Sequence, residues 1–311
     1  MTYDELKEQI NQGNYFEVFE FLDGLYEKFP EEDRSVFHSL RKEYVVGVSK
    51  NDIHFISRLK VFVSGVKRIL QSKESPPSSS SDSQPTSLED HYDGYEKWMK
   101  FGASHLKEGK YLEAVNAFQK AVDVMPESEE GWSYLGNAFE YAKDLQKASD
   151  AYHKVLEINP NAYVACYDLG RVEDGMGNIY NAINFHKKAV KINPNYALAW
   201  NGLGKTYYDV GKNQESLEAC RKALDIDPQF HVAWVNLGRA YHNLYRPKEA
   251  IDAFTKALEI NSQYDSALFN LGWVYETQGR FREAIKMYQD GLEINPDYEW
   301  AKNSLNKLLR R

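Results

Sequence analysis

The stretch from Trp132 to Pro160, WSYLGNAFEYAKDLQKASDAYHKVLEINP, returns along the chain at a fixed interval. Its central glycine recurs every thirty-four residues, as Gly102, Gly136, Gly170, Gly204, Gly238 and Gly272. No insertion or deletion interrupts the series, which makes six consecutive units. A period of this length is typical of a solenoid, in which a repeat buries its apolar face only against its neighbours.

The spacing inside one unit predicts a helical hairpin. Residues of one helix face follow Trp132 at three, four and seven positions: Leu135, Gly136 and Phe139. A second set follows with helical spacing: Ala148, Tyr152 and Val155. Pro160 ends the second helix, because proline cannot continue it. We expect a large side chain of one helix to pack over a small residue of the other.

This W-x2-L-G-x2-Y, A-x3-F-x2-A, P pattern resembles the tetratricopeptide repeat over about two thirds of the chain. The resemblance implies an all-α fold, a right-handed α-solenoid of six helical hairpins: 95–128, 129–162, 163–196, 197–230, 231–264 and 265–298. Residues 299–311 are expected to form a capping helix. Departures from the pattern are local: Cys166 and Leu268 for Trp, His105 and Glu173 for Tyr, Ser216 for Ala, His186 and Cys220 for Phe, Val155 and Gly291 for the later Ala, and Ser262 for Pro.

Residues 1–71 lack the repeat and predict a four-helix bundle. A first helix is expected from Thr2 to Gln12, with Thr2 and Glu5 as a capping box, and a second from about Phe16 to Phe29. Further apolar stripes mark a third helix (Val36, Leu40, Tyr44) and a fourth (Ile53, Ile56, Leu59, Phe62, Val63, Val66, Ile69). Residues 72–94, SKESPPSSSSDSQPTSLEDHYDG, read as a flexible, disordered Ser/Pro linker, because so few apolar residues cannot offset the entropy of ordering.

Charge divides the N-terminal domain into two halves. Residues 1–33 hold ten acids and two bases, whereas residues 34–71 hold two acids and eight bases. One interpretation is that the halves attract each other within the bundle. The other is a two-faced adhesive domain whose candidate contact residues are Glu17, Glu20, Asp23, Arg41, Lys42, Arg58 and Lys60.

The segments INQGNYFEVFEFL and LRKEYVVGVSKNDIHFISRLKVFVSGVKRIL resemble the effector-associated domains of bacteria, a class of death-fold-like adaptor modules. Their closest matches are Gly13-Asn14-Tyr15 and Gly47-Val48-Ser49. The resemblance implies that residues 1–71 pair with a like domain in another protein and recruit an effector in a signalling or defence assembly.

The tetratricopeptide resemblance also implies a peptide-binding groove. In that family the concave face uses the positions three before, one after and four after the marker glycine, with the position two before at its edge. Carried over, this gives Asn137, Tyr167, Arg171, Asn201, Lys205, Tyr208, Asn236, Arg239, His242, Phe269, Asn270 and Trp273. The basic row Arg171, Lys205 and Arg239 suits the carboxylates of an extended acidic or C-terminal peptide. In the alternative, these are ordinary solvated residues, with Glu140 and Asp174 neutralising the bases.

Signals of catalysis, membrane insertion or nucleic-acid binding are weak. Gly202-Leu203-Gly204-Lys205-Thr206 mimics the end of a phosphate loop, but it lies inside a predicted helix rather than at a strand-to-helix turn. The eight histidines are scattered, and no HExxH or CxxC motif occurs. The formal net charge of −8 disfavours nucleic acid, and no apolar run is long enough to span a bilayer. We expect no enzyme activity, cofactor, metal, nucleic acid or membrane contact.

The polar start of the chain and the two repeat-core cysteines, Cys166 and Cys220, lead us to expect a cytoplasmic protein without disulfides. The sequence favours a non-enzymatic adaptor that links two recognition modules. Two other functions stay open: a co-chaperone or assembly factor that holds a client in the repeats, and a regulatory subunit of an enzyme on another chain.

Overall fold

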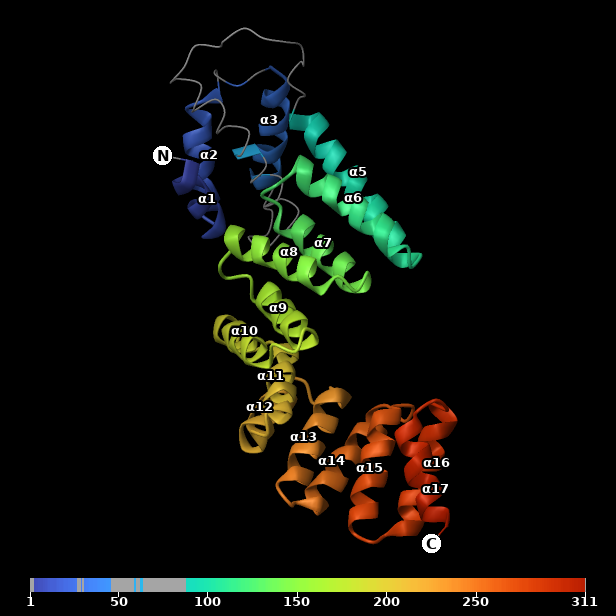
Figure 1. Ribbon diagram of the computed structural model, residues 1–311. Helices are drawn as coiled ribbons and strands as arrows, with labels where there is room; N and C mark the ends of the chain where they lie inside the picture. The colour runs from blue at the N-terminus through green and yellow to red at the C-terminus, as the bar shows by residue number, and fades with distance from the viewer. Residues whose placement is uncertain are drawn as a thin grey trace. The chain divides into compact units, whose positions relative to one another are not determined.

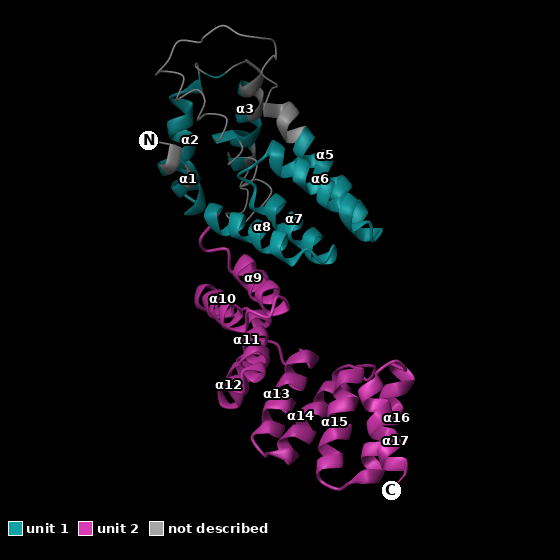
Figure 2. Ribbon diagram, viewed as in Figure 1, with its two compact units in different colours: residues 1–158 teal, residues 159–311 magenta. Residues whose placement is uncertain are grey.

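The computed structural model describes residues 3–26, 29, 31–45, 59, 62–63 and 88–310. These described residues form sixteen helices and no strand, which confirms the predicted all-α class (Figure 1). They fall into two compact units, residues 1–158 and 159–311, which are described separately below (Figure 2). The first unit contains α1–α3 and α5–α8, and the second contains α9–α17.

The N-terminal helices are α1 (Tyr3–Asn11), α2 (Tyr15–Asp23) and α3 (Glu31–Val45). They share an apolar core made of Leu6, Ile10, Tyr15, Val18, Phe19, Leu22, Phe29, Phe37, Leu40, Leu59, Phe62 and Val63. The second helix is shorter than predicted because Gly24 caps it, although Phe29 is still buried. Of the predicted fourth helix, only the three residues Leu59, Phe62 and Val63 are described.

α5 (Leu88–Lys107) begins inside the stretch predicted as linker. Residues 72–87 of that stretch lie outside the described part of the chain. The difference follows from composition, because the last proline is Pro85 and the last serine of the run is Ser87. Beyond them, LEDHYD contains neither proline nor glycine, the residues that disfavour a helix most. The predicted boundary at residue 94 is therefore too late.

The remaining helices keep the thirty-four-residue period of the sequence. From α6 to α17 they are α6 (Tyr111–Val124), α7 (Glu129–Tyr141), α8 (Leu145–Ile158), α9 (Tyr163–Gly175), α10 (Ile179–Ile192), α11 (Ala197–Asp209), α12 (Asn213–Ile226), α13 (His231–Asn243), α14 (Pro247–Ile260), α15 (Asp265–Thr277), α16 (Phe281–Ile294) and α17 (Glu299–Leu309). Every even-numbered helix from α6 to α16 starts thirty-four residues after the previous one, and so does every odd-numbered helix from α7 to α17.

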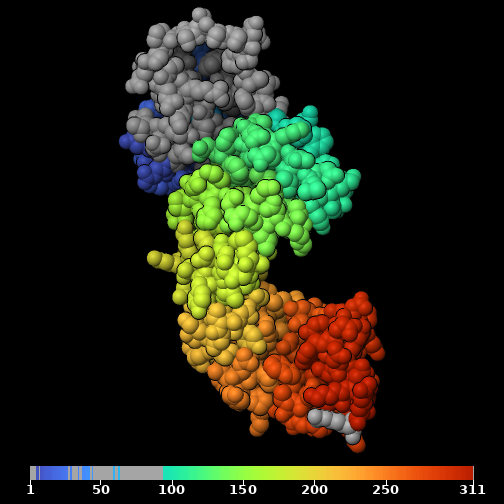
Figure 3. Space-filling model, in the orientation of Figure 1, coloured from blue at the N-terminus to red at the C-terminus, as the bar shows by residue number. Residues whose placement is uncertain are grey.

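The marker glycines allow the two helices of each hairpin to approach closely. A Cβ atom on Gly136 would lie 2.6 Å from the ring of Tyr152, and one on Gly238 would lie 2.6 Å from the ring of Phe254. Both rings are almost fully buried. The predicted packing of large residues over small ones is therefore observed, and side chains fill the space between successive ribbons of the second unit (Figure 3).

Tryptophans tie one repeat to the loop before it. The indole N–H groups of Trp132, Trp200 and Trp234 donate to the carbonyl oxygens of Pro126, Pro194 and Pro228, at 2.7, 2.8 and 2.9 Å. Each of these carbonyls lies in the turn just beyond the preceding helix, so the hydrogen bond fixes that turn against the first helix of the next repeat. This contact explains why Trp and Pro recur together in the sequence pattern.

Tyr245 provides a test of backbone strain at the hairpin turn. The φ of Tyr245 is 58°, in the left-handed region, and its side chain is 94% exposed. Gly177, at the equivalent position two repeats earlier, has a φ of 82°. We expect Tyr245→Gly to raise the free energy of unfolding by about 1 kcal/mol, since glycine adopts this conformation without strain. Gly177→Ala, with no atom within 4 Å of the added Cβ, should lower it by a similar amount. Urea unfolding followed by circular dichroism measures both variants. A loss of stability in Tyr245→Gly would contradict the inference that the backbone at Tyr245 is strained.

Candidate functional site

The first helices of the repeats in the second unit, α9, α11, α13 and α15, contact one another in sequence order. The residue four after one marker glycine meets the residue one after the next. Three such pairs occur: Asp174 with Lys205, Tyr208 with Arg239, and His242 with Trp273. We call these pairs the three rungs. They place polar and aromatic predicted groove residues on one continuous face.

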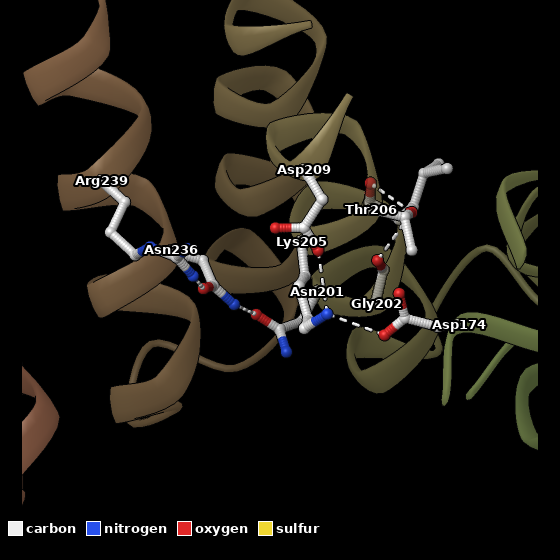
Figure 4. Close-up of polar contacts among 9 residues, drawn as sticks. Asp174, Asn201, Gly202, Lys205, Thr206, Asp209, Asn236 and Arg239 are labelled. Atoms are coloured by element: carbon white, nitrogen blue, oxygen red, sulfur yellow. Dashed lines mark hydrogen bonds and ion pairs between the residues drawn. The ribbon is translucent and has the colours of Figure 1, made fainter. Parts of the chain in front are cut away.

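In the first rung Lys205 is neutralised by two carboxylates (Figure 4). Its Nζ lies 2.7 Å from Oδ2 of Asp174 and 2.9 Å from Oδ2 of Asp209. Partial burial lowers the pKa of Lys205, but the hydrogen bonds to Asp174 and Asp209 outweigh it and raise the pKa overall. Lys205 is therefore charged and already paired.

The second rung carries a cation of a different kind. The guanidinium carbon of Arg239 lies 4.0 Å from the ring centroid of Tyr208. Arg239 also makes a long hydrogen bond of 3.5 Å to Oδ1 of Asn236, which in turn donates to Oδ1 of Asn201 at 2.9 Å (Figure 4). No carboxylate in the described part of the chain forms an ion pair with Arg239.

The third rung is aromatic. The rings of His242 and Trp273 have centroids 4.1 Å apart and are tilted by 59°. Burial lowers the pKa of His242, so this imidazole is neutral at pH 7. The rung offers apolar surface next to Arg239 without adding a charge.

Arg171 extends the row on α9, but it too faces an acid. Its Nε lies 3.7 Å from Oδ1 of Asp168, and its guanidinium carbon lies 5.7 Å from the ring centroid of Tyr167. Tyr167 also packs edge-on against Tyr196, with centroids 5.5 Å apart. Of the predicted basic row, Arg239 is thus the member that stacks on an aromatic ring without a described acidic partner.

Other predicted groove residues have contacts of their own. Asn137, in the first unit, accepts a hydrogen bond from the Tyr152 hydroxyl at 2.9 Å. Asn270 donates to the main-chain oxygen of Ser266 at 2.7 Å. Phe269 is buried in the core of the last hairpin and therefore offers little surface to a ligand.

The candidate contact residues of the N-terminal domain are only partly described. Glu17 and Glu20 are exposed on α2, and Lys42 is exposed on α3. Asp23 and Arg41 form an ion pair between these helices. This pair fits the interpretation in which the acidic and basic halves attract each other within the domain. Arg58 and Lys60 lie outside the described residues.

Two features of the face were not anticipated or were ambiguous in the sequence. Asp209 was not predicted, although its i, i+4 spacing from Lys205 on one helix is a signal of pairing. The Gly202–Thr206 segment lies within α11, where the Thr206 hydroxyl donates to the carbonyl of Gly202 at 3.0 Å. A helix interior of this kind does not form a phosphate loop.

Models of the tetratricopeptide repeat family match residues 129–162, 163–196, 197–230 and 229–297. Residues 129–297 are a tetratricopeptide repeat array. The predicted family is therefore confirmed for this part of the chain. The matches begin at residue 129, so they give no support to the resemblance of residues 1–71 to effector-associated domains. No curated protein matches the chain.

Solved structures place the tetratricopeptide array among known folds. MamA of Desulfovibrio magneticus RS-1 is 25% identical, covers 56% of this chain and 98% of its own, and has a TM-score of 0.50. Cut9–Hcn1, described as an APC/C hetero-tetramer, is 20% identical and covers 95% of this chain and 59% of its own, with a TM-score of 0.65. PilF of Pseudomonas aeruginosa is 13% identical and covers 70% and 99%, with a TM-score of 0.60. The last two show likeness of fold alone.

A tetratricopeptide array is a scaffold for protein–protein interaction, and this chain carries one. Such arrays are generally not enzymes. Within the described residues, no helix is both long and apolar enough to cross a membrane. The same residues contain no group of three or more His, Cys, Asp or Glu side chains placed to hold a metal ion.

Proposed function

We propose that the chain is a non-enzymatic adaptor whose array binds an extended acidic peptide along the three rungs. The observation that supports this is Arg239, a half-buried guanidinium that stacks on Tyr208 and has no described acidic partner. A planar guanidinium held in this way is suited to two parallel hydrogen bonds with a carboxylate. Lys205 and Arg171 play a lesser part, because each already faces an acid.

The neighbours of Arg239 suit the rest of such a peptide. Asn236 is buried and holds the side chain of half-buried Asn201 beside it, and the amide of Asn201 combines donors and an acceptor for a peptide main chain. The aromatic rung of His242 and Trp273 lies one repeat further on and offers apolar contact to a peptide side chain. A partner with one acidic residue next to a bulky apolar one therefore fits this face.

The N-terminal domain supplies the second contact of the adaptor. Its proposed partner is a like domain in another protein, as the resemblance to bacterial effector-associated modules implies. Two recognition modules on one chain raise the local concentration of each other's partners, which is how a scaffold acts without chemistry. We place the adaptor in the cytoplasm, since Cys166 and Cys220 are free and buried as expected in a reducing compartment.

Arg239→Glu tests the peptide-binding proposal. We expect the full chain to select acidic sequences from an array of decapeptides that represents acidic, neutral and basic sequences equally. Fluorescence titration with a selected peptide should show about tenfold or greater loss of affinity in Arg239→Glu, since a charge-assisted bidentate contact is replaced by repulsion. Asp174→Asn with Asp209→Asn should strengthen binding, because it releases the charge of Lys205.

Lys222→Glu, a change of equal charge on exposed α12, is the matched control and should leave affinity unchanged. Equal losses in Lys222→Glu and Arg239→Glu would show that only overall charge matters. That result, or an absence of acidic sequences among the selected peptides, would contradict the proposal.

A further inference from the structure

The second helix of the third repeat, α10, differs in charge from its five counterparts. Counting Lys and Arg as +1 and Asp and Glu as −1, α8 is neutral and α6, α12, α14 and α16 are each −1. α10 carries Lys187, Lys188 and Lys191 and no acid, which makes it +3. The six helices occupy equivalent places in their repeats, so a purely solvating role does not account for the difference.

The lysines of α10 also lack the ion pairs of their counterparts. Lys154 in α8 pairs with Glu157 at 2.6 Å, and Lys256 in α14 pairs with Glu259 at 2.8 Å. At the equivalent position Lys188 is followed, three residues on, by Lys191. Like charges at this spacing repel one another. In the described part of the chain none of the three α10 lysines forms an ion pair.

These lysines share one solvent-facing stripe of α10 with an aromatic side chain. Tyr180 is 73% exposed near the start of the helix, and Asn184, Lys188 and Lys191 follow it at helical spacing. Lys187 lies beside them, with its Nζ 5.7 Å from the ring centroid of Tyr207. The α10 face is therefore Tyr180, Asn184, Lys187, Lys188 and Lys191, an exposed aromatic ring followed by a block of positive charge.

The chain also contains a surface of complementary character. Residues 1–33 hold ten acids and two bases, a formal charge of −8. Within this segment α2 exposes Glu17 and Glu20 on the same side as Phe16, whose ring is 67% exposed. The α2 face, made of Phe16, Glu17 and Glu20, thus joins an exposed aromatic ring to negative charge.

We propose that the α10 face of one copy of the chain binds the α2 face of a second copy. The two aromatic rings contribute apolar burial, and the lysines and glutamates contribute complementary charge and orientation. The contact joins two different surfaces, so it is heterologous, and each copy retains one α2 face and one α10 face for further copies. It leaves the basic half of the N-terminal domain, including Lys42, for a like domain of another protein.

This contact is independent of the proposed peptide-binding face, because α10 is a second helix and the rungs lie on first helices. A loss of assembly with intact peptide binding, or the reverse, therefore distinguishes the failure of one proposal from the failure of the other. A polyanion such as nucleic acid is a poorer occupant of the α10 face, since the chain as a whole carries a net charge of −8.

Sedimentation velocity of the full chain over a range of concentrations tests the proposal. We expect self-association that weakens as salt is raised from about 0.05 to 0.5 M, because exposed charges are screened. Lys187→Glu with Lys188→Glu, and separately Glu17→Lys with Glu20→Lys, should each weaken association about tenfold or more, since each turns attraction into repulsion. An equimolar mixture of the two variants should restore association, because every α2 face then meets a complementary α10 face.

The matched control is Lys222→Glu with Lys248→Glu, which makes the same charge change on exposed positions of α12 and α14 and should associate like the unmodified chain. Failure of the mixture to restore association would overturn the proposal. So would a chain that stays monomeric at all concentrations, or a control that weakens association as much as the α10 variant does.

Discussion

Acidification from pH 6.5 to pH 4 should remove about 3 kcal/mol from the free energy of unfolding through His186 alone. This histidine is 1% exposed and stands where other repeats place an aromatic ring against the marker glycine. Added Cβ atoms on Gly170 and Gly202 would lie 2.4 and 2.7 Å from its Cε1, so the ring has little room to move. Its Nδ1 has no hydrogen-bond partner among the described residues.

Acid destabilises the fold because the pKa of His186 is lower in the folded chain than in the unfolded chain. Burial, which disfavours the charged imidazolium, lowers the pKa of His186 to about 4. The unfolded chain binds a proton with the ordinary histidine pKa of about 6.5. The stabilisation is therefore complete above pH 6.5 and is lost as the pH falls from 6.5 to 4.

Urea unfolding at pH 7, 5.5 and 4 measures the effect, and His186→Phe provides the control. Phenylalanine fits the position, because Phe254 fills the equivalent place against Gly238. Carboxylates that titrate in the same range contribute equally to both proteins, so the difference between them isolates the histidine. The same loss of stability in both proteins would show that His186 is not the group responsible.

Phe254→Ala should lower the free energy of unfolding by about 3–5 kcal/mol. The ring is 1% exposed and lies in the core shared by α12 to α15. Gly238 of α13 lies against that ring, and the packing of α13 on α11, α12 and α15 prevents it from filling the space that the ring would leave. The loss therefore includes a cavity as well as the transfer of the ring from water.

Leu198→Ala, at an exposed position of α11, is the matched control for this truncation and should change the free energy by less than about 0.5 kcal/mol. Both variants are compared by urea unfolding of the full chain at pH 7. A cost for Phe254→Ala as small as that of Leu198→Ala would mean that the repeat repacks around the lost ring.

The repeats were predictable because a glycine at a fixed offset from a large side chain requires the two helices of a hairpin to pack closely at that point. Gly136 recurs with its partner Tyr152 at a constant offset, and the close approach that only a small residue permits follows from that offset. The ends of α2 and α5 were less predictable. Phe29 belongs to the core without belonging to a helix, and the helix at Leu88 begins where a low-complexity run gives way to ordinary sequence.

The sequence predicts which residue types line the candidate site, but it does not predict which of the basic side chains are neutralised by an acid. The sequence places Arg171, Lys205 and Arg239 at equivalent positions, and only the contacts separate them. Lys205 is neutralised by Asp174, which lies thirty-one residues earlier in the chain. Such a pairing also depends on the side-chain rotamers, which the spacing of residues along the sequence does not determine. The positive charge of α10 can be counted in the sequence, but the structure is needed to show that its three lysines lie together on a solvent-exposed face.

Each rung is a pair of side chains from two neighbouring repeats. Duplication or loss of a repeat in evolution would therefore change which side chains are paired at the new junction. Loss of residues 197–230 would bring Asp174 opposite Arg239, because all helix starts keep the same period. The guanidinium would then be paired with an acid, although neither residue had changed. Specificity in this chain is a property of repeat order as much as of residue identity.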